Sequence, residues 1–236
     1  MNAIEFIDVG KQYGELEALC DIRLSVKKGE TLVICGPSGA GKSTLLRALN
    51  GLESISRGEI KVFGQPIAKA LPEKVAMVFQ HFHLFPHLSI VDNLIHAPIR
   101  ALKLSRRDAI AAAMRVLNQV GIADQADKYP PQLSTGQQQR VAIARSLCMQ
   151  PDLLLFDEPT STDTTQEVMK VMTDIAKSDI TMVCVTHEID FARKIADRIV
   201  FMDKGKVVEI APPEQLLTNP QHPKTQHFLE QLLSYQ

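Results

Sequence analysis

A glycine-rich stretch near the amino-terminal end constrains the fold of this chain more than any other feature. Residues 36–43 read GPSGAGKS and match the pattern G-x-x-x-x-G-K-[ST]. A short apolar run, Leu32 to Cys35, precedes the stretch, and leucine and alanine recur at helical spacing after it. A run of this length that is apolar throughout is typical of a strand inside an α/β sheet. The order of strand, glycine-rich loop and helix therefore predicts an α/β core with a phosphate-binding loop.

The composition of this loop suits a bound triphosphate. Its glycines let the backbone wrap closely around a phosphate with N–H groups pointing inward, and the following helix directs its positive end at the same anion. Lys42 would neutralise the β- and γ-phosphates, and Ser43 would coordinate Mg²⁺. Ala40 breaks the pattern of a hydrolase nucleophile elbow, G-x-S-x-G, so we reject that interpretation. The residues expected to bind the nucleotide here are Gly36, Pro37, Ser38, Gly39, Ala40, Gly41, Lys42, Ser43 and Thr44.

A second apolar run ends in two acidic residues. Residues 153–156 read LLLF and are followed by Asp157 and Glu158. Asp157 at the tip of a strand can hold Mg²⁺, and Glu158 can lie beside the γ-phosphate and polarise an attacking water. An ordinary strand end with two solvated acids has the same sequence. The phosphate-binding loop elsewhere in the chain favours the catalytic interpretation.

The segment LSTGQ at residues 133–137 predicts the start of a helix. Ser134 and Gln137 have the S-x-x-Q spacing of a capping box. The positive end of such a helix, with a hydroxyl at its tip, is a second place where an anion can bind. Taken by itself, the segment indicates only a capped helix.

Apolar strands and helical segments alternate along most of the chain, which predicts a mainly parallel sheet covered by helices. After residue 86 the pattern becomes helical and stays so up to residue 150. We therefore expect a single domain with its core at residues 1–86 and 151–236 and a helical subdomain inserted at residues 87–150. The expected strands cover residues 3–9, 18–26, 32–35, 58–63, 74–79, 153–156, 180–185 and 198–202.

The composition excludes several classes of protein. Apolar residues make up 45% and charged residues 22% of the chain, as in globular proteins. Lys and Arg total 26 against 27 Asp and Glu, so no overall field attracts nucleic acid or an anionic membrane. The first residues lack the pattern of a secretory signal, and no apolar run approaches membrane-spanning length. We expect a chain that is soluble by itself, with buried, reduced thiols at Cys20, Cys35, Cys148 and Cys184.

The motifs together resemble those of the ATP-binding cassette (ABC) family over essentially the whole chain. The shared features are the phosphate-binding loop, LSTGQ, LLLFDE and the pair Thr186-His187. The resemblance implies a P-loop NTPase core with a mainly parallel sheet, an antiparallel β part near the N-terminus and an inserted helical subdomain. It also implies that Tyr13 stacks on adenine and that His187 contacts the γ-phosphate. Gln80 would join Mg²⁺ and the attacking water to the helical subdomain.

The same resemblance implies a head-to-tail dimer. In this family the LSTGQ signature of one subunit closes on the nucleotide of another, so Ser134, Gly136 and Gln137 would reach ATP bound to a second copy. Two Mg-ATP would then be held between the copies. The implied catalytic residues are Glu158, His187 and Gln80, and the implied Mg²⁺ ligands are Ser43, Gln80 and Asp157.

Three further stretches resemble the polar amino acid uptake branch of the family. They are residues 79–88, residues 185–188 and the tail from Asn219 to Leu229. The resemblance implies a peripheral, ATP-hydrolysing subunit of an importer at the cytoplasmic face of a bacterial inner membrane. Its partners would be integral membrane permease subunits and, indirectly, a substrate-binding protein, with no nucleic acid.

Two other classes of function stay open. One is a soluble ATPase of this family that acts on ribosomes or DNA, although such proteins typically carry two cassettes or a long coiled-coil insertion. The other is an ATP-gated interaction module without transport, for example one linked to cell division.

Two positions depart from the family pattern. Thr135 stands where the signature normally has its first glycine, and a β-branched residue adds bulk and restricts the backbone there. The stretch after Glu158 is a few residues short, and Asp163 is the candidate for the aspartate that reaches the partner's phosphate-binding loop. We expect reduced coupling between the two ATP sites, and restoring the missing residues should raise turnover.

The histidines at positions 81, 83 and 87 follow the pattern H-x-H-x₃-H, which is compatible with a zinc site. No cysteine or acid before Asp92 completes a compact ligand set. The favoured interpretation is that Phe82, Phe85 and Leu88 form an apolar docking surface for a membrane subunit. A buried turn of the core is the alternative.

Overall fold

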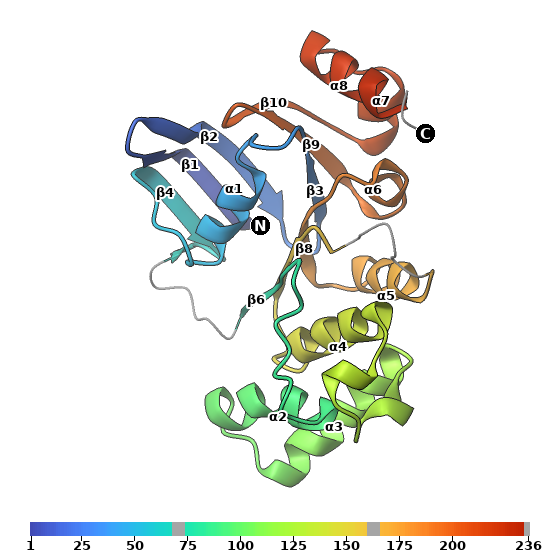
Figure 1. The fold of residues 1–236 in the computed structure, drawn as a ribbon. Helices are drawn as coiled ribbons and strands as arrows, with labels where there is room; N and C mark the ends of the chain where they lie inside the picture. Colours follow the sequence, from blue (N-terminus) through green and yellow to red (C-terminus); the bar gives the residue numbers. More distant parts are fainter. Residues whose placement is uncertain (68–73, 160–165, 234–236) are drawn as a thin grey trace.

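The computed structural model describes residues 1–67, 74–159 and 166–233 of the chain. In these ranges the chain forms two sheets and a group of helices that lies apart from the smaller sheet (Figure 1). None of the helices described is both long enough and apolar enough to cross a membrane.

The smaller sheet is antiparallel and contains the first strands of the chain. It consists of β1 (Asn2–Tyr13), β2 (Leu16–Lys27), β4 (Arg57–Val62) and β5 (Gln65–Pro66), in the order β2-β1-β4-β5. The predicted antiparallel part is confirmed, but β1 and β2 are longer than expected. The reason is that β1 and β2 stay paired through several register shifts, where the alternation of apolar and polar residues is interrupted.

The larger sheet has six strands, and only its edge strand β10 is antiparallel to its neighbour. The order is β10-β9-β3-β8-β7-β6. The strands are β3 (Thr31–Cys35), β6 (Val75–Val78), β7 (Leu153–Asp157), β8 (Thr181–Val185), β9 (Arg198–Asp203) and β10 (Lys206–Ala211). The predicted mainly parallel sheet is therefore confirmed.

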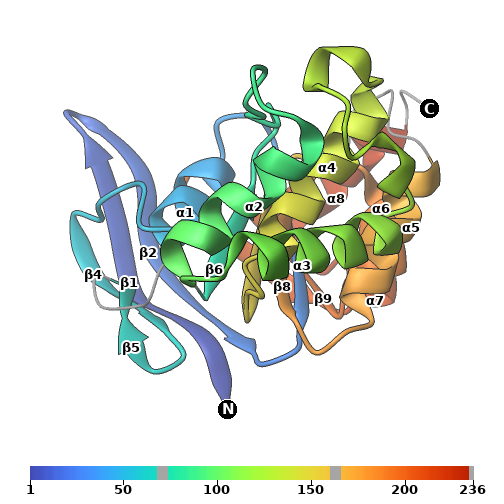
Figure 2. The same cartoon turned by 90° about the horizontal axis from the view of Figure 1, so that it is seen from below.

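The helices fall into three groups. The first helix after the glycine-rich loop is α1 (Lys42–Leu49), which packs between the two sheets. Three helices pack against one another in the region expected to be a helical subdomain: α2 (Ile90–Ala101), α3 (Arg106–Gln119) and α4 (Thr135–Leu147). The others are α5 (Gln166–Ala176), α6 (Ile189–Ile195), α7 (Pro213–Thr218) and α8 (Pro223–Leu233). Figure 1 shows α2 and α3 beyond α4, at the opposite end of the molecule from α7 and α8. Figure 2, seen from below, has α2 and α3 on the near side.

The central strands are buried on both faces, and alternate residues serve two different cores. In β3, Leu32 and Ile34 pack with α1 and the antiparallel sheet. Val33 and Cys35 pack with the helices on the other side. This period of two explains why the strand is apolar throughout, because neither of its faces meets water.

Serine caps determine where the inserted helices begin. Ser89 and Ser105 accept hydrogen bonds from the backbone N–H groups of Asp92 and Asp108, at 3.2 and 3.1 Å. The helical stretch is therefore interrupted between α2 and α3. The predicted boundaries at residues 87 and 150 enclose α2 to α4, and the division into core and subdomain at those residues stays a prediction.

The prediction that all four cysteines are buried is wrong for Cys20. Three thiols lie in the core, and burial raises the pKa of Cys35 and of Cys148 to about 12. Cys20 is half-exposed on β2, and its thiol lies near Asp21 and Arg57. The antiparallel sheet has an outer face, and the apolar neighbours of Cys20 in the sequence point to the inner one.

We expect a thiol reagent such as DTNB to modify one cysteine in the folded protein and four after denaturation. The pKa of Cys20 is itself raised, mainly by partial desolvation and then by Glu17, so this reaction should be slow at neutral pH and accelerate in alkaline buffer. The Cys20→Ser variant should lose the reaction in the folded state. Rapid native modification of two or more thiols would contradict the described core.

Candidate nucleotide-binding site

Four neighbouring parallel strands bring the predicted site residues to one edge of the larger sheet. The glycine-rich loop follows β3, and His187 lies two residues after β8. Asp157 ends β7, and Gln80 lies two residues after β6. Because β3, β8, β7 and β6 are adjacent and parallel, their carboxyl ends meet at the same edge, where α/β proteins commonly bind ligands.

Lys42 is held inside the glycine-rich loop. Its Nζ donates hydrogen bonds to the carbonyl oxygens of Gly36 and Pro37 at 2.8 and 3.0 Å. Burial lowers the pKa of Lys42, and the nearby carboxylates of Glu158 and Asp157 act in the opposite direction. The direct partners of the ammonium are neutral carbonyl oxygens, so its positive charge is available to a phosphate.

Ser43 and Asp157 meet across the start of α1 and the end of β7. The Ser43 hydroxyl donates to Oδ1 of Asp157 at 2.8 Å, and the Asp157 side chain is almost fully buried. A guanidinium nitrogen of Arg47 lies 3.9 Å from the other carboxylate oxygen. A hydroxyl and a carboxylate side by side are oxygen donors of the kind that Mg²⁺ prefers, so these residues fit the ion.

Glu158 lies between the two other predicted catalytic residues. One carboxylate oxygen is 2.9 Å from Nε2 of His187, and the other accepts a hydrogen bond from the amide of Gln80 at 3.3 Å. The backbone of Glu158 has φ of 48°, in the left-handed region that non-glycine residues rarely adopt, and its N–H donates to the Val185 carbonyl at 2.9 Å. Strained backbone is one of the features found at active sites.

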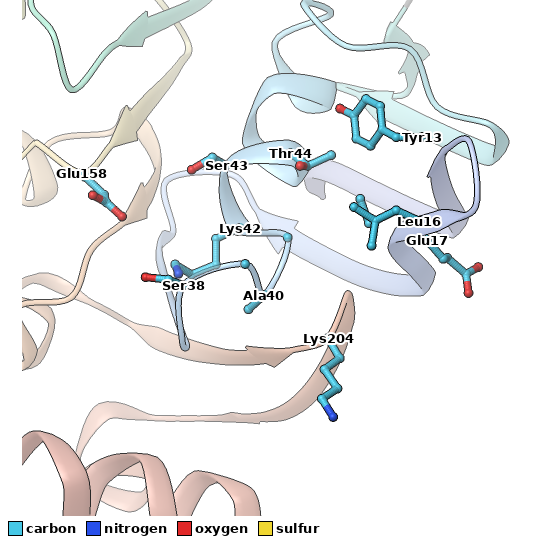
Figure 3. Close-up of a pocket in the computed structure, with 13 residues that line it drawn as sticks. Tyr13, Leu16, Glu17, Ser38, Ala40, Lys42, Ser43, Thr44, Glu158 and Lys204 are labelled. Carbon is cyan, nitrogen blue, oxygen red and sulfur yellow. The ribbon is translucent and has the colours of Figure 1, made fainter.

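A cavity of about 500 Å³ lies over the glycine-rich loop. In Figure 3, Ser38, Lys42 and Ser43 lie between Glu158 on one side and Tyr13 and Leu16 on the other. The lining residues are Tyr13, Leu16, Glu17, Ala18, Ser38, Gly39, Ala40, Gly41, Lys42, Ser43, Thr44, Glu158 and Lys204. The structure thus brings the predicted aromatic residue, the loop and the predicted base to one cavity.

Sequence reasoning missed four of these lining residues. Three of them, Leu16, Glu17 and Ala18, begin β2 directly after the turn that follows Tyr13. Their closeness to Tyr13 in the sequence could have indicated that they line the same cavity. Lys204 had no such signal, because it reaches the cavity through tertiary packing. The hairpin between β9 and β10 meets the loop through the Gly205 N–H, which donates to the Ala40 carbonyl at 3.0 Å.

The LSTGQ segment forms the predicted capping box at the start of α4. The Gln137 N–H donates to the Ser134 hydroxyl at 3.3 Å, and the Ser134 N–H donates to the Gln137 side chain at 2.9 Å. Thr135 is the first residue of the helix, and its side chain is exposed. Ser134, Gly136 and Gln137 are not among the residues that line the cavity. Within one chain, therefore, the structure does not bring this helix end to the phosphate-binding loop.

The segment after Gln80 is tied to α4 and α2. Arg145 of α4 donates hydrogen bonds to the carbonyl oxygens of His83 and Phe82, at 2.7 and 2.9 Å. Asn93 of α2 accepts from the Phe85 N–H at 2.8 Å. Of the three residues expected to form an apolar surface, Phe82 and Leu88 are half-buried, and Phe85 is 41% exposed.

The histidine pattern does not come together as a metal site. Among the residues that the structure describes, no group of three or more His, Cys, Asp or Glu side chains is arranged to hold a metal ion. His81 and His83 face each other edge to face, with ring centroids 6.4 Å apart, whereas His87 lies against Phe85. The candidate aspartate at position 163 and the shortened loop fall in residues 160–165, outside the described ranges.

Comparisons with known proteins show which family this chain is similar to. A family model described as "ABC transporter" matches residues 19–161. The general L-amino acid transport ATP-binding protein AapP of Rhizobium johnstonii is 49% identical, over 98% of this chain and 93% of that protein. The glutamine transport ATP-binding protein GlnQ of Geobacillus stearothermophilus is 48% identical, over 98% of this chain and 100% of that protein. The glutamate/aspartate import ATP-binding protein GltL of Escherichia coli is 48% identical, over 96% and 98%.

Solved structures share the fold. The dimeric post-hydrolysis state of the ATP-binding cassette MJ0796, bound to ADP and Pi, has a TM-score of 0.80 and 31% identity, covering 89% of this chain and 98% of that chain. The structure of cbiO1 from Clostridium perfringens, part of the ABC transporter complex cbiONQ, has a TM-score of 0.83 and 29% identity, covering 97% and 99%. The predicted fold class is confirmed by these similarities.

We expect alanine to be tolerated differently at two glycines of the loop. A Cβ at Gly41 would lie 2.5 Å from the Ala18 carbonyl oxygen, whereas a Cβ at Gly39 would meet nothing within 4 Å. Both residues have positive φ, of 94° and 78°, so both substitutions strain the backbone by about 1 kcal/mol. Gly41→Ala should lower the free energy of unfolding by about a further 1–3 kcal/mol, because the loop must move off β2. Urea denaturation measures both variants, and equal losses would contradict the close approach.

Proposed function

This chain belongs to the ABC transporter family as an ATP-binding subunit, and from that premise we propose that it hydrolyses ATP to drive the import of polar amino acids. The three relatives named above carry out transport of L-amino acids, glutamine, and glutamate or aspartate, according to their names. Their similarity extends over at least 96% of this chain. This full-length similarity supports an amino acid importer over other members of the family.

The observation that carries the catalytic assignment is the position of Glu158 between His187 and Gln80, at the edge of the loop that holds Lys42. Phosphates bound in the loop would replace the carbonyl partners of the Lys42 ammonium. The Glu158 carboxylate is the base within reach, and it would accept a proton from a water that attacks the terminal phosphorus. His187 and Gln80 would hold the carboxylate and the water in line.

Mg²⁺ would be held by the Ser43 hydroxyl and the Asp157 carboxylate, with Gln80 as a further oxygen donor. The ion would supply positive charge against the phosphates. The hydrogen bond between Ser43 and Asp157 supports this assignment, because it keeps both oxygens at one place. ATP and Mg²⁺ are thus the expected substrate and cofactor.

A second copy of the chain would complete each site. Ser134 is exposed, and neither Ser134 nor Gly136 lines the cavity of its own chain. The helix end nevertheless has the capping geometry that suits an anion. A head-to-tail pair would place this helix end over the partner's ATP. The similarity to the dimeric cassette MJ0796, bound to ADP and Pi, supports this arrangement.

The membrane subunits would bind at the segment after Gln80. Phe85 presents an exposed ring there, and Arg145 and Asn93 hold the backbone on which that ring stands. A helix of a permease subunit seated on this surface would move the segment and, with it, Gln80. The chain would then work at the cytoplasmic face of a bacterial inner membrane, and a substrate-binding protein would act through the permease.

Replacing Glu158 with Gln should separate ATP binding from hydrolysis. The amide keeps the shape of the side chain but cannot accept the proton, so phosphate release should fall by about a hundredfold or more. The variant should accumulate as a dimer with bound ATP, as measured by size-exclusion chromatography with light scattering.

Two matched variants control this experiment. Glu214→Gln alters an exposed acid on α7 and should hydrolyse ATP at the parent rate. Lys42→Ala should lose ATP binding and remain monomeric. Hydrolysis by Glu158→Gln at the parent rate would refute the assigned base, and a monomer at every ATP concentration would refute the dimer.

The transport function is tested in proteoliposomes that contain the permease subunits and the substrate-binding protein. We expect ATP hydrolysis to rise when glutamine, glutamate or another polar amino acid is added on the side of the binding protein. Phe85→Ser should lose this stimulation and keep the basal ATP hydrolysis of the free subunit, because the ring lies outside the cavity. If no amino acid raises ATP hydrolysis by the parent protein, a role other than transport is favoured.

A further inference from the structure

A buried lysine lies behind the aromatic ring at the edge of the cavity. Lys11 of β1 is only 7% exposed. Its Nζ is 2.7 Å from a carboxylate oxygen of Glu53 and donates to the Ser54 carbonyl at 2.6 Å. The same nitrogen lies over the ring of Tyr13, 4.7 Å from the ring centroid. None of the steps described above uses this lysine, although burying a charged side chain is costly.

The lysine borders the ring but does not line the cavity. Tyr13 lines the cavity and is 44% exposed, whereas neither Lys11 nor Glu53 is among the lining residues. The ammonium lies over one face of the ring, and we infer that the other face is the one open to the cavity. Figure 3 shows Tyr13 above Leu16, with the hydroxyl end of the ring on the side of Thr44.

Polar side chains also lie at the hydroxyl end of the ring (Figure 3). The Tyr13 hydroxyl contacts the side chains of Glu53 and Thr44. The pKa of Glu53 is lowered first by its hydrogen bond with Lys11 and next by the one with Tyr13, so this acid is a carboxylate that accepts from both. Thr44 belongs to α1, directly after the glycine-rich loop. The ring is thus fixed relative to the residues that bind phosphate.

We propose that Lys11, together with Glu53, is a positioning residue for recognition of the adenine base, because it holds the Tyr13 ring in the orientation that accepts the base. This inference rests on the proposed function, in which Tyr13 stacks on adenine. A ring already fixed at two points loses less freedom when the base binds. The ammonium also attracts electron density toward the covered face, which makes the open face a better partner for an electron-rich purine.

A purely structural role for Lys11 predicts something different. Its bond to the Ser54 carbonyl joins β1 to the segment after α1, so its loss could simply loosen the protein. Loosening would weaken the binding of every ligand of the loop. Loss of a positioning role would weaken the binding only of ligands that contain the base, and this difference can be measured.

The experiment compares ATP with tripolyphosphate, which has the phosphates but no base. Binding of both, with Mg²⁺, is measured by isothermal titration calorimetry for the parent protein, Lys11→Met and Lys11→Arg. Lys11→Met keeps the apolar stem and removes the charge, and it should raise the Kd for ATP about three- to tenfold while the Kd for tripolyphosphate stays within about twofold. Lys11→Arg should restore most of the affinity for ATP. Lys28→Met, at an exposed lysine, is the matched control and should change neither constant.

Glu53→Gln is a second variant that removes the carboxylate instead of the ammonium, and it should give the same split between the two ligands. Equal weakening of the binding of ATP and tripolyphosphate, or no weakening of either, would overturn the positioning role.

Tyr13→Ala and Lys42→Ala distinguish failure of the proposed nucleotide site from failure of this inference about Lys11. If Lys42→Ala still binds both ligands, the proposed nucleotide site is wrong. If Tyr13→Ala loses affinity for ATP and the variants at Lys11 and Glu53 do not, only this inference is wrong.

Discussion

The parallel pairing of β3, β8 and β7 is the constraint on which the site depends. Ile34 of β3 pairs with Val185 of β8, and Val185 also pairs with Asp157 of β7. These pairings end the three strands at the same level, so the loop, His187 and Glu158 start from neighbouring points. Slippage by one residue would turn the apolar side chains of a strand toward the wrong core, and the two-sided burial prevents it. The same packing that stabilises the sheet therefore positions the chemistry.

Charge is handled differently at the two ends of the cavity. At the phosphate end, the Lys42 ammonium is bonded to neutral carbonyl oxygens and the acids lie nearby without neutralising it directly. Next to Tyr13 at the other end, and outside the cavity lining, the Lys11 ammonium is paired with Glu53 and lies over the aromatic ring. An unpaired cation suits a polyanionic ligand, and a paired one suits a fixed support. The two lysines thus illustrate how burial and partners decide what one type of side chain does.

The chain also contains parts that do not meet within one molecule. The capped start of α4 has the geometry for an anion and yet does not line the cavity of its own chain. The segment after Gln80 runs from the neighbour of Glu158 to the exposed ring of Phe85. Arg145 and Asn93 hold its backbone by hydrogen bonds. Both features would have a purpose in the proposed assembly, where a second copy would complete the site and movement would be passed to a membrane partner.

The sequence by itself determined the phosphate-binding loop, the strand that ends at Asp157 and the capping box at Ser134, because each depends on residues close together in the chain. It also determined the parallel core, since apolar runs separated by helical segments have few other arrangements. Tertiary structure alone decided that Lys204 borders the cavity, that Cys20 is half-exposed and that Lys11 lies behind Tyr13. Those contacts join segments that are distant in the chain, or depend on which face of a strand looks outward. Local sequence patterns predict neither the distant contacts nor the outward face, because the packing between elements is determined only when the whole core forms.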